Sequence, residues 1–560
     1  MTMEGLLQCA ANYVPLTPTS FLERAAFVHG NKTSIIYRDT RYTWRQTHER
    51  CSKLASALVM LKISRGDIVV AMAPNVPALY ELHFAVPMAG ATLSALNIRL
   101  DEHALTIILH QLRPKIIFVD SEFVQLVSKV INNKNNMQIQ ENHHDHKPLL
   151  IAIYDDSPYH RAQCDLEVQE YEQTLATGDN NFQAVNPTDE CDPISVNFTS
   201  GSTGTPKAVA YSHRAAYLNS LGLILRYEMG KSSVFLWTVD MFRCNGWCFA
   251  WAMAALGGVN VCIRNMSTKI IFDSIQLHKV THLCGKPTIL NLIAESPSVD
   301  QKPLPSRVDV IIAGAFPTTD VIKRVQELGF NIIYGYGMTE ALGPAHIRPW
   351  RSSQHHHHDD DDDHHEDYNL KCREGLHNIT LEAADVKDPT TMRSVPRDGK
   401  TMGEVMLRGN TLMAGYLGDP EATQEAFSSG WFKTGDVGVR HADGCVEMKD
   451  RARDVIFFGK EVISTLDIEA VLLSHPKVAE AAVVAQYTVV AGQVPCAFVK
   501  LKEGRCSKAE EIVEFCAERL QNAAMVPKTV SFGDLPMNST GKVQKSVLRE
   551  RANAIGQLCP

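Results

Sequence analysis

Short apolar runs alternate with stretches of helical periodicity over residues 60–300. The runs Ile68–Ala73 (IVVAMA) and Ile116–Asp120 (IIFVD) have the length and apolar content of buried strands. Between such runs, apolar residues recur at helical spacing, as in Val76–Val86 and Ile271–His278. The alternation predicts an α/β region in which helices cover buried strands.

A strand, helix, strand order follows near residue 310. Val308–Ala313 and Asn331–Tyr334 are predicted strands, and Asp320–Leu328 is the predicted helix between them. The second strand ends on the glycine-rich run GYGMTE. Because α/β sheets usually bind ligands at the carboxyl ends of their strands, we expect residues 335–340 to line a ligand site.

The pattern changes after residue 402 to short strands and turns, such as GEVMLRG, GWFKTGD and ADGCVEMKD. The run DRARD (Asp450–Asp454) then opens a smaller segment. A chain of 560 residues exceeds one hydrophobic core, since a domain typically takes roughly 100 to 200 residues. We predict an α/β fold with a large N-terminal domain of stacked subdomains and a small β region (residues 1–450), followed by a small α+β domain (residues 451–560).

A low-complexity segment interrupts the large domain at residues 354–367. Its core, HHHHDDDDDHHED, is too polar to bury an apolar face, so we expect a disordered loop. Metal binding by the histidines and aspartates is the alternative. No function is assigned to this loop.

Composition narrows the function classes. The formal net charge is -8, and no Lys/Arg cluster interleaved with aromatic residues is visible, which argues against a nucleic-acid partner. The fourteen cysteines form no CxxC pair, and Cys244 and Cys248 lack a matching histidine cluster, so reduced thiols are expected.

The chain ends and apolar runs bear on location. The N-terminus carries Glu4 and lacks the basic and long apolar regions of a signal peptide. No apolar run reaches the roughly 18 residues needed to cross a bilayer. We expect a soluble cytoplasmic protein without a transmembrane segment. A peroxisomal location stays open, although the final residues GQLCP do not match a Ser-Lys-Leu signal.

Two phosphate-compatible elements lie more than three hundred residues apart. The first, TSGSTGTPK, follows the predicted strand DPISVNF, and the second, STGKVQK, contains Lys542. Small residues let backbone amides approach phosphate oxygens, and a lysine adds a positive charge. Pro206 excludes a Walker A loop, which requires Gly-Lys-Ser/Thr there. The predicted phosphate-binding residues are Thr199, Ser200, Gly201, Ser202, Thr203, Gly204 and Lys207.

With YGYGMTE, TGD, DRARD and TGK, this loop completes an ordered motif set that resembles the adenylate-forming superfamily of acyl-CoA synthetases, luciferases and adenylation domains. The stretches NYVPLTPTSFLERAA, FRCNGWC and ATQEAFSSGWFKTGD further resemble the plant acyl-activating enzymes. The resemblance implies that ATP, with Mg²⁺, activates a short or medium carboxylic acid to an acyl-adenylate. Coenzyme A then displaces AMP to give a thioester.

The resemblance also implies roles for individual residues. Tyr336 would lie against adenine, Thr339 would donate to the α-phosphate, and Glu340 would hold Mg²⁺, which prefers oxygen ligands. Asp436 and Arg451 would bind the ribose. At the end of the preceding strand, Gly314 and Ala315 would line the adenine and acyl pocket.

The small domain carries the remaining implied roles. Lys542 resembles the family's catalytic lysine, which bridges carboxylate and α-phosphate oxygens during adenylation. Arg453 would be the hinge about which the mobile small domain rotates, removing Lys542 for thioester formation. The implied catalytic set is therefore Lys542, Thr339 and Glu340.

Several positions depart from the family pattern. Arg243 stands where histidine is usual, Asp240 where proline is usual, and Ala208 where glycine is usual. Lys286 replaces a small residue. In the small domain, FFGKEVIS, which includes Lys460 and Val462, replaces Gly-Gly-Glu-Asn-Ile-Ser.

These departures cluster at the acyl and coenzyme A sites, where Arg243 and Trp247 are candidate acyl-pocket residues. They leave two alternatives open: an adenylating enzyme with another acceptor, and a catalytically impaired nucleotide-binding relative.

Overall fold

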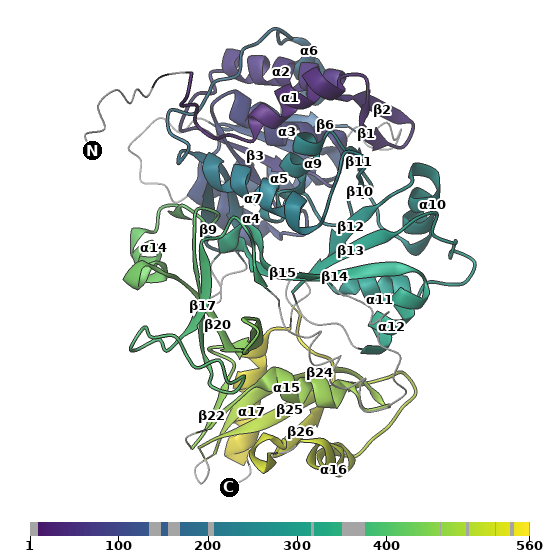
Figure 1. The fold of residues 1–560 in the computed structure, drawn as a ribbon, viewed down its shortest axis with the longest axis vertical. Helices are drawn as coiled ribbons and strands as arrows, with labels where there is room; N and C mark the ends of the chain where they lie inside the picture. The colour runs from purple at the N-terminus through teal and green to yellow at the C-terminus, as the bar shows by residue number, and fades with distance from the viewer. Residues whose placement is uncertain are drawn as a thin grey trace.

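The computed structural model describes residues 9, 11–133, 147–154, 168–199, 206–314, 319–349, 376–459, 461–488, 492–520, 522–537 and 543–558. Two large sheets with their helices occupy the upper part of the molecule in Figure 1, and the C-terminal segment forms a separate body at the bottom. The predicted α/β class, with a large N-terminal and a small C-terminal domain, is confirmed. The predicted loop at 354–367 lies outside the described residues.

An eight-stranded sheet, as far as the chain is described, contains the two strands that flank the run TSGSTGTPK. Its order is β19-β9-β8-β4-β3-β5-β6-β7, and the strands from β8 to β7 are parallel. The strands predicted at IVVAMA and IIFVD are confirmed, and they are the neighbouring inner strands β3 and β5 of this sheet. The strand bounds are β3 Ile68–Met72, β4 Thr92–Ala95, β5 Ile116–Asp120, β6 Leu149–Ile153, β7 Gln169–Glu170, β8 Pro193–Phe198, β9 Ala208–Ser212 and β19 Gly415–Tyr416.

A nine-stranded sheet lies beside it in the described chain, with the order β16-β15-β14-β13-β12-β10-β11-β1-β2. Its strands from β14 to β1 are parallel, and antiparallel strands close both edges. The bounds are β1 Thr33–Tyr37, β2 Thr40–Thr43, β10 Val234–Leu236, β11 Val259–Val261, β12 His282–Gly285, β13 Val308–Ala313, β14 Phe330–Met338, β15 Gly343–Pro349 and β16 Leu376–His377.

The strand predicted at Asn331–Tyr334 was too short. β14 continues through the first four residues of GYGMTE to Met338, because β15 pairs with β14 up to that residue. Glycine permits this close pairing: a Cβ on Gly337 would lie 2.0 Å from the carbonyl oxygen of Gly343. The strand therefore delivers Thr339 and Glu340 at its carboxyl end.

Helices cover both sheets. The helix predicted at Val76–Val86 is α3, and the one predicted at Ile271–His278 is α10, which begins three residues earlier. The bounds are α1 Thr19–His29, α2 Trp44–Met60, α3 Pro77–Met88, α4 Glu102–Leu112, α5 Val124–Asn132, α6 Tyr171–Ala176, α7 His213–Arg226, α9 Phe249–Leu256, α10 Thr268–His278, α11 Thr288–Ala294 and α12 Thr319–Glu327. Within the described chain, no helix combines the length and the apolar character that crossing a bilayer requires.

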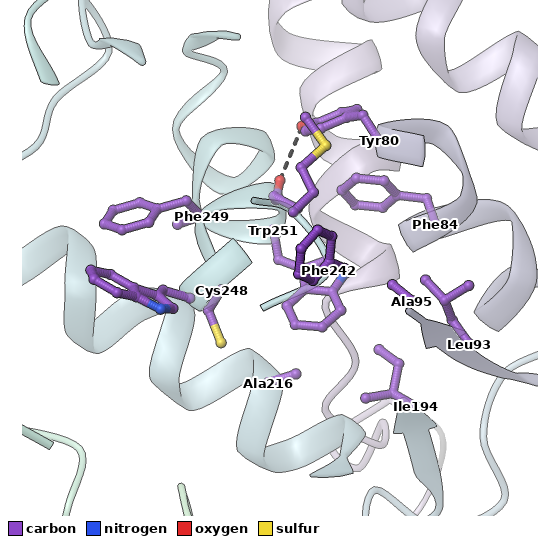
Figure 2. Close-up of a cluster of buried hydrophobic side chains, with 14 of the residues drawn as sticks. Tyr80, Phe84, Leu93, Ala95, Ile194, Ala216, Phe242, Cys248, Phe249 and Trp251 are labelled. Carbon is purple, nitrogen blue, oxygen red and sulfur yellow. Dashed lines mark hydrogen bonds between the residues drawn. The ribbon is translucent and has the colours of Figure 1, made fainter. Parts of the chain in front are cut away.

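A large aromatic core joins the two sheets. In Figure 2, Tyr80 and Phe84 of α3 lie on the side of α9 that carries Trp251, and the hydroxyl of Tyr80 donates to the carbonyl of Ala250 (3.0 Å). Phe249 of α9 points to the opposite side and stacks on Phe235. Phe242 and Cys248 belong to the same cluster. Buried apolar contacts at Phe242 and Cys248 therefore fix both ends of the segment between these two residues.

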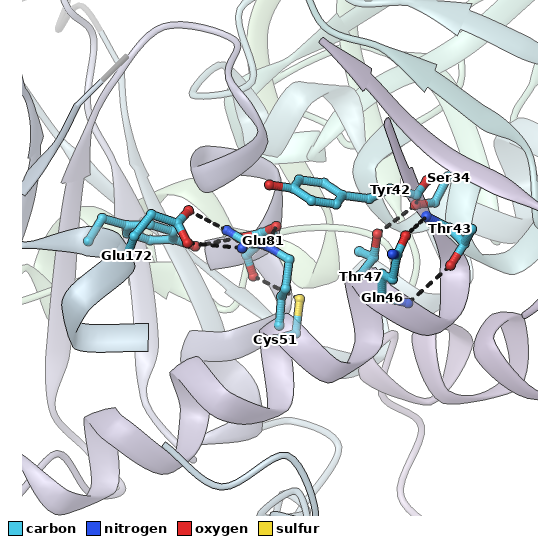
Figure 3. A network of polar contacts seen from close by, with 10 residues as sticks. Ser34, Tyr42, Thr43, Gln46, Thr47, Cys51, Glu81 and Glu172 are labelled. Atoms are coloured by element: carbon cyan, nitrogen blue, oxygen red, sulfur yellow. Dashed lines mark hydrogen bonds and ion pairs between the residues drawn. The ribbon is translucent and has the colours of Figure 1, made fainter. Parts of the chain in front are cut away.

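A buried ion pair ties α2 to α3 (Figure 3). Arg50 binds the fully buried Glu81 through two hydrogen bonds of 2.6 and 3.1 Å, and Tyr171 donates to the same carboxylate at 2.6 Å. Glu172 adds a second carboxylate to Arg50 (2.6 Å). Because every partner is satisfied, the network is compatible with burial, and we assign it a structural role.

A four-stranded sheet follows, with the order β17-β18-β20-β21 in the described residues. After it, the described residues form the hairpin β22–β23, a sheet of the order β24-β25-β26, and helices α15, α16 and α17. The short strands predicted after residue 402 are β18, β20 and β21. The bounds are β17 Ala383–Lys387, β18 Gly403–Arg408, α14 Pro420–Ala426, β20 Phe432–Arg440, β21 Val446–Arg451, β22 Ile456–Phe458, β23 Glu461–Ile463, α15 Thr465–Leu473, β24 Val478–Thr488, β25 Gly492–Leu501, α16 Ala509–Arg519, β26 Thr529–Phe532 and α17 Lys545–Leu558.

Candidate active site

Three predicted residues from distant parts of the chain meet in one cluster. Tyr336 on β14 donates from Oη to Oδ2 of Asp436 at 2.6 Å, and Nε of Arg451 lies 2.7 Å from Oδ1. Asp436 and Arg451 are direct partners across strands β20 and β21. Burial and the charge of Asp436 raise the pKa of Tyr336 above its ordinary value, so its hydroxyl stays protonated and donates. The cluster presents an oriented carboxylate beside an aromatic ring.

The Thr339–Glu340 pair lies next to β9, the strand that follows the run TSGSTGTPK. Tyr211 on β9 donates to the carbonyl oxygen of Thr339 (2.7 Å), and Met413 N donates to that of Glu340 (2.8 Å). The Glu340 carboxylate accepts from Tyr416 Oη at 3.0 Å. The backbone of this pair is therefore fixed, which leaves its carboxylate as an oxygen ligand of the kind that Mg²⁺ prefers.

A backbone hydrogen bond joins the two end residues of the run TSGSTGTPK. Thr199 directly follows β8 and Lys207 directly precedes β9, and Thr199 N donates to the Lys207 carbonyl at 3.1 Å. Lys207 Nζ lies 4.7 Å from the ring centroid of Tyr416. The predicted phosphate-binding residues between these two ends, Ser200, Gly201, Ser202, Thr203 and Gly204, lie outside the described residues.

A left-handed turn connects Phe242 to α9, and Trp247 and Cys248 of this turn belong to the aromatic core. Five consecutive residues, Cys244–Cys248, have positive φ values between 44° and 63°. Such a run is costly for L-residues and persists only where surrounding contacts enforce it. Asn245 N donates to Asn197 Oδ1 (3.0 Å), and its side chain accepts from Ser195 (2.7 Å).

The turn places Trp247 against β15. A Cβ on Gly343 would lie 3.6 Å from Cα and Cβ of Trp247, whose side chain is almost fully buried. Trp247 therefore contacts the segment after Glu340, where a wall of an acyl pocket is expected.

The same turn contains Cys244. Burial raises the pKa of the Cys244 thiol to about 11, so this cysteine is protonated near neutral pH.

Two departures from the family pattern compensate each other. Nε of Arg243 lies 2.9 Å from Oδ2 of Asp240, and Nη2 of Arg99 lies 2.5 Å from the same oxygen. Both guanidinium groups also lie over Phe242, at 5.4 and 5.6 Å from the ring centroid. The positive charge at residue 243 therefore has a carboxylate partner contributed by the other substituted position.

Two further departures have simple structural readings. Ala208 is an ordinary strand residue of β9 that pairs with Phe198, so replacing glycine there requires no left-handed backbone. Lys286 is half-buried just beyond the carboxyl end of β12. The neighbouring strand β13 ends before Gly314, which has φ 122° and whose carbonyl accepts from Tyr334 (2.9 Å). Ala315 lies outside the described residues.

The candidate hinge separates contacts that point to opposite sides. Arg451 pairs with Asp436, while the adjacent Asp450 carboxylate accepts from N and Oγ1 of Thr465 at the start of α15, both at 2.6 Å. Arg453 itself is exposed. Helix α17 is anchored near the same point, since Lys545 Nζ lies 2.7 Å from Glu469 and from Thr465 Oγ1. Lys542, three residues before Lys545, and Lys460 lie outside the described residues.

The substituted run FFGKEVIS contributes to the hairpin β22–β23. Phe457 and Val462 are cross-strand partners, with 55% and 36% of their surfaces exposed. The substitution in this segment therefore places an apolar pair on the surface of the small domain.

Sequence reasoning missed Tyr211 and Tyr416. Both contact the Thr339–Glu340 pair, but neither belongs to a motif with phosphate or metal chemistry. Tyr416 reaches the site because β19 adds to the edge of β9, a pairing over two hundred residues that no local pattern indicates.

Comparison with known proteins gives the same picture. The family model for the AMP-binding enzyme matches residues 22–417, and that for the AMP-binding enzyme C-terminal domain matches residues 467–542. The chain is 46% identical to probable acyl-activating enzyme 21 of Arabidopsis thaliana, over 99% of this chain and 98% of the relative.

Two further relatives are named for their reactions. The chain is 44% identical to the peroxisomal butyrate–CoA ligase of Arabidopsis thaliana and 44% identical to the peroxisomal trans-cinnamate:CoA ligase of Petunia hybrida, over 99% of this chain and 96% and 97% of the relatives. Its fold is similar to that of ATP-bound MatB from Rhodopseudomonas palustris (TM-score 0.80, 22% identity, covering 96% and 99% of the two chains). The chain belongs to the AMP-binding enzyme family.

Proposed function

We propose that the protein is an AMP-forming carboxylate–CoA ligase, which uses ATP to convert a carboxylic acid to an acyl-adenylate and then to an acyl-CoA thioester. The observation that carries it is the meeting of Tyr336, Asp436 and Arg451 beside Glu340 and Lys207 in a chain with CoA-ligase relatives at 44% identity. The large domain (residues 1–450) would supply the nucleotide site, and the small domain (residues 451–560) would supply Lys542.

In the first half-reaction, a carboxylate oxygen attacks the α-phosphorus of ATP, and the bond to pyrophosphate breaks. The residues from Thr199 to Lys207 would hold the departing phosphates, and Thr339 would donate to the α-phosphate. Tyr336 would pack against adenine. Glu340 would hold Mg²⁺, which supplies charge neutralisation between the two anions. Gly314 and Ala315 would leave room for the adenine and the acyl group.

The ribose and the catalytic lysine complete this step. Asp436, held by Tyr336 and Arg451, would accept from the ribose hydroxyls. Lys542 would bridge the carboxylate and the α-phosphate. Preorganised donors of this kind contribute where charge develops in the transition state.

In the second half-reaction, the thiol sulfur of coenzyme A attacks the acyl carbonyl carbon, AMP leaves, and the thiol proton is released. We propose that the small domain rotates at Arg453 between the two steps. Rotation would require a change in the contacts that Asp450 makes with Thr465, because these two residues lie on opposite sides of the hinge. The hairpin with Phe457 and Val462 belongs to the domain that would move.

The acid is proposed to be short or medium in length. Relatives are named for butyrate and for trans-cinnamate, and Trp247 would close the pocket beside β15. Arg243 would lie at the rim, since its charge is paired with Asp240.

The proposal is tested by incubating the purified protein with ATP, Mg²⁺ and a panel of aliphatic and aromatic acids, with and without coenzyme A. The expected result is acid-dependent AMP formation together with an acyl-CoA product. An enzyme with another acceptor would give acid-dependent ATP–pyrophosphate exchange and no acyl-CoA. Intact ATP binding without AMP from any acid would indicate a catalytically impaired relative.

The compartment is part of the proposal. We propose the cytoplasm, with the peroxisome as the alternative because two relatives carry that location in their names. Imaging a fusion with the fluorescent protein at the N-terminus, which leaves the C-terminus free, distinguishes the two.

A further inference from the structure

Strand β19, which contains Tyr416, pairs with β9, the strand directly after the run TSGSTGTPK. Tyr416 pairs with Val209 across β9, and Leu417 N donates to the carbonyl of Ala208 at 2.8 Å. Ala208 directly follows Lys207. Tyr416 N is also satisfied, since it donates to Thr423 Oγ1 (2.9 Å). The backbone of Tyr416 is therefore fixed relative to Lys207.

The side chain of Tyr416 contacts two residues of opposite charge. Its hydroxyl donates to Glu340 Oε1 at 3.0 Å, and its ring face lies 4.7 Å from Lys207 Nζ. A tyrosine hydroxyl is protonated near neutral pH, so it donates to this carboxylate. An ammonium group over an aromatic face is attracted by the ring quadrupole. One rigid side chain thus orients both a cation and a carboxylate.

We propose that Tyr416 is a positioning residue that couples the metal ligand Glu340 to the phosphate-binding Lys207, an inference that rests on the proposed function. The hydroxyl selects the orientation of the Glu340 carboxylate, and the ring selects the position of the Lys207 ammonium. The two contacts are chemically separable: phenylalanine keeps the ring and removes the donor, whereas leucine removes both.

The test measures ATP binding by calorimetry, with Mg²⁺ and with EDTA, in wild type, Tyr416→Phe and Tyr416→Leu. Tyr416→Phe should weaken Mg·ATP binding about tenfold, the scale of a hydrogen bond to a charged group, and leave binding in EDTA within about twofold. Tyr416→Leu should weaken binding in both conditions, because Lys207 loses its support as well.

Tyr80→Phe is the matched control. It removes a buried hydroxyl that donates to a backbone carbonyl in the aromatic core, and it should lower Tm without changing either binding constant. Thermal unfolding of all variants identifies any that fail to fold, and Tyr416→Phe, which loses one oxygen, keeps the test readable if Tyr416→Leu does not fold.

The inference is overturned if Tyr416→Phe binds Mg·ATP as tightly as wild type, or if its loss is equal with and without Mg²⁺. A wild-type protein that binds Mg·ATP and forms no AMP with any acid contradicts the ligase proposal instead. Because the readout is binding, this second outcome is distinguishable from the first.

Discussion

Tyr336 donates a 2.6 Å hydrogen bond to Asp436, one hundred residues away in the sequence. Asp436 is almost fully buried, with 3% of its surface exposed, and its other oxygen faces Arg451. A buried carboxylate with two fixed donors has a single orientation, which is what recognition of two adjacent ribose hydroxyls requires.

Asp436→Asn should raise KM for ATP about 10- to 100-fold, because charge-assisted hydrogen bonds contribute about 1.5–3 kcal/mol each. kcat should fall less. Steady-state AMP formation at varied ATP concentration checks this split. Asp388→Asn, at a turn after β17, is the control and should leave KM within about twofold. An unchanged KM in Asp436→Asn would remove Asp436 from the nucleotide site.

Lys542→Ala should slow adenylation about 100-fold or more, since loss of a preorganised transition-state donor costs about 3 kcal/mol. Thioester formation from supplied acyl-adenylate should stay within a few-fold of wild type. Pyrophosphate exchange measures the first rate, and acyl-CoA formation measures the second. Lys528→Ala, an exposed lysine of the same domain, should change neither. Equal loss of both half-reactions would contradict the assigned role.

Gly246→Ala should destabilise the fold by at least about 2 kcal/mol, because a Cβ there would lie 2.5 Å from Trp237 and the residue has φ 58°. Urea unfolding measures the change. Gly66→Ala is a matched control, since Gly66 also has positive φ but a Cβ at that position would have nothing within 4 Å. Equal losses in both variants would show that the contact with Trp237 contributes nothing.

Asp240, Arg243 and Arg99 should behave as one compensated cluster. Their side chains are 27%, 21% and 46% exposed, so the coupling free energy between Asp240 and Arg243 should be about 0.5–1 kcal/mol. A double-mutant cycle with Asp240→Ala and Arg243→Ala, followed by urea unfolding, measures it. Additive effects of the two substitutions would mean that the two departures from the family pattern do not compensate.

Acidification should destabilise the protein through buried histidines. Burial lowers the pKa of His83 and of His213 to about 4, from the ordinary 6.5. Between pH 6.5 and 4 the unfolded chain binds protons that the folded chain does not, so stability falls as the pH falls.

Each histidine should account for up to about 3 kcal/mol across that window. His213→Gln, which can keep a polar contact with Thr17, should flatten the dependence measured by urea unfolding at several pH values. His103→Gln, an exposed position on α4, is the control. A slope that is identical in His213→Gln and in wild type would contradict the assignment.

Much of the fold was predictable from sequence, and so were the residues of the Tyr336–Asp436–Arg451 cluster. Strands such as Ile68–Met72 are continuous apolar runs, because parallel strands are buried on both faces. Tyr336, Asp436 and Arg451 stand in the motifs YGYGMTE, TGD and DRARD, which can be identified in the sequence without knowledge of the fold. The extension of β14 through Gly337 was not predictable, because it depends on the close approach of Gly343.

The sequence by itself determined the residue types of the chemistry and the α/β class, because motif composition and hydrophobic period are local properties. Tertiary structure alone decided which charges compensate and which side chains orient others. Asp240, which pairs locally with Arg243, also pairs with Arg99 from a distant segment, and Tyr416 reaches both Glu340 and Lys207. Contacts over long sequence separations depend on strand order and register, which are properties of the whole packed chain and not of any segment.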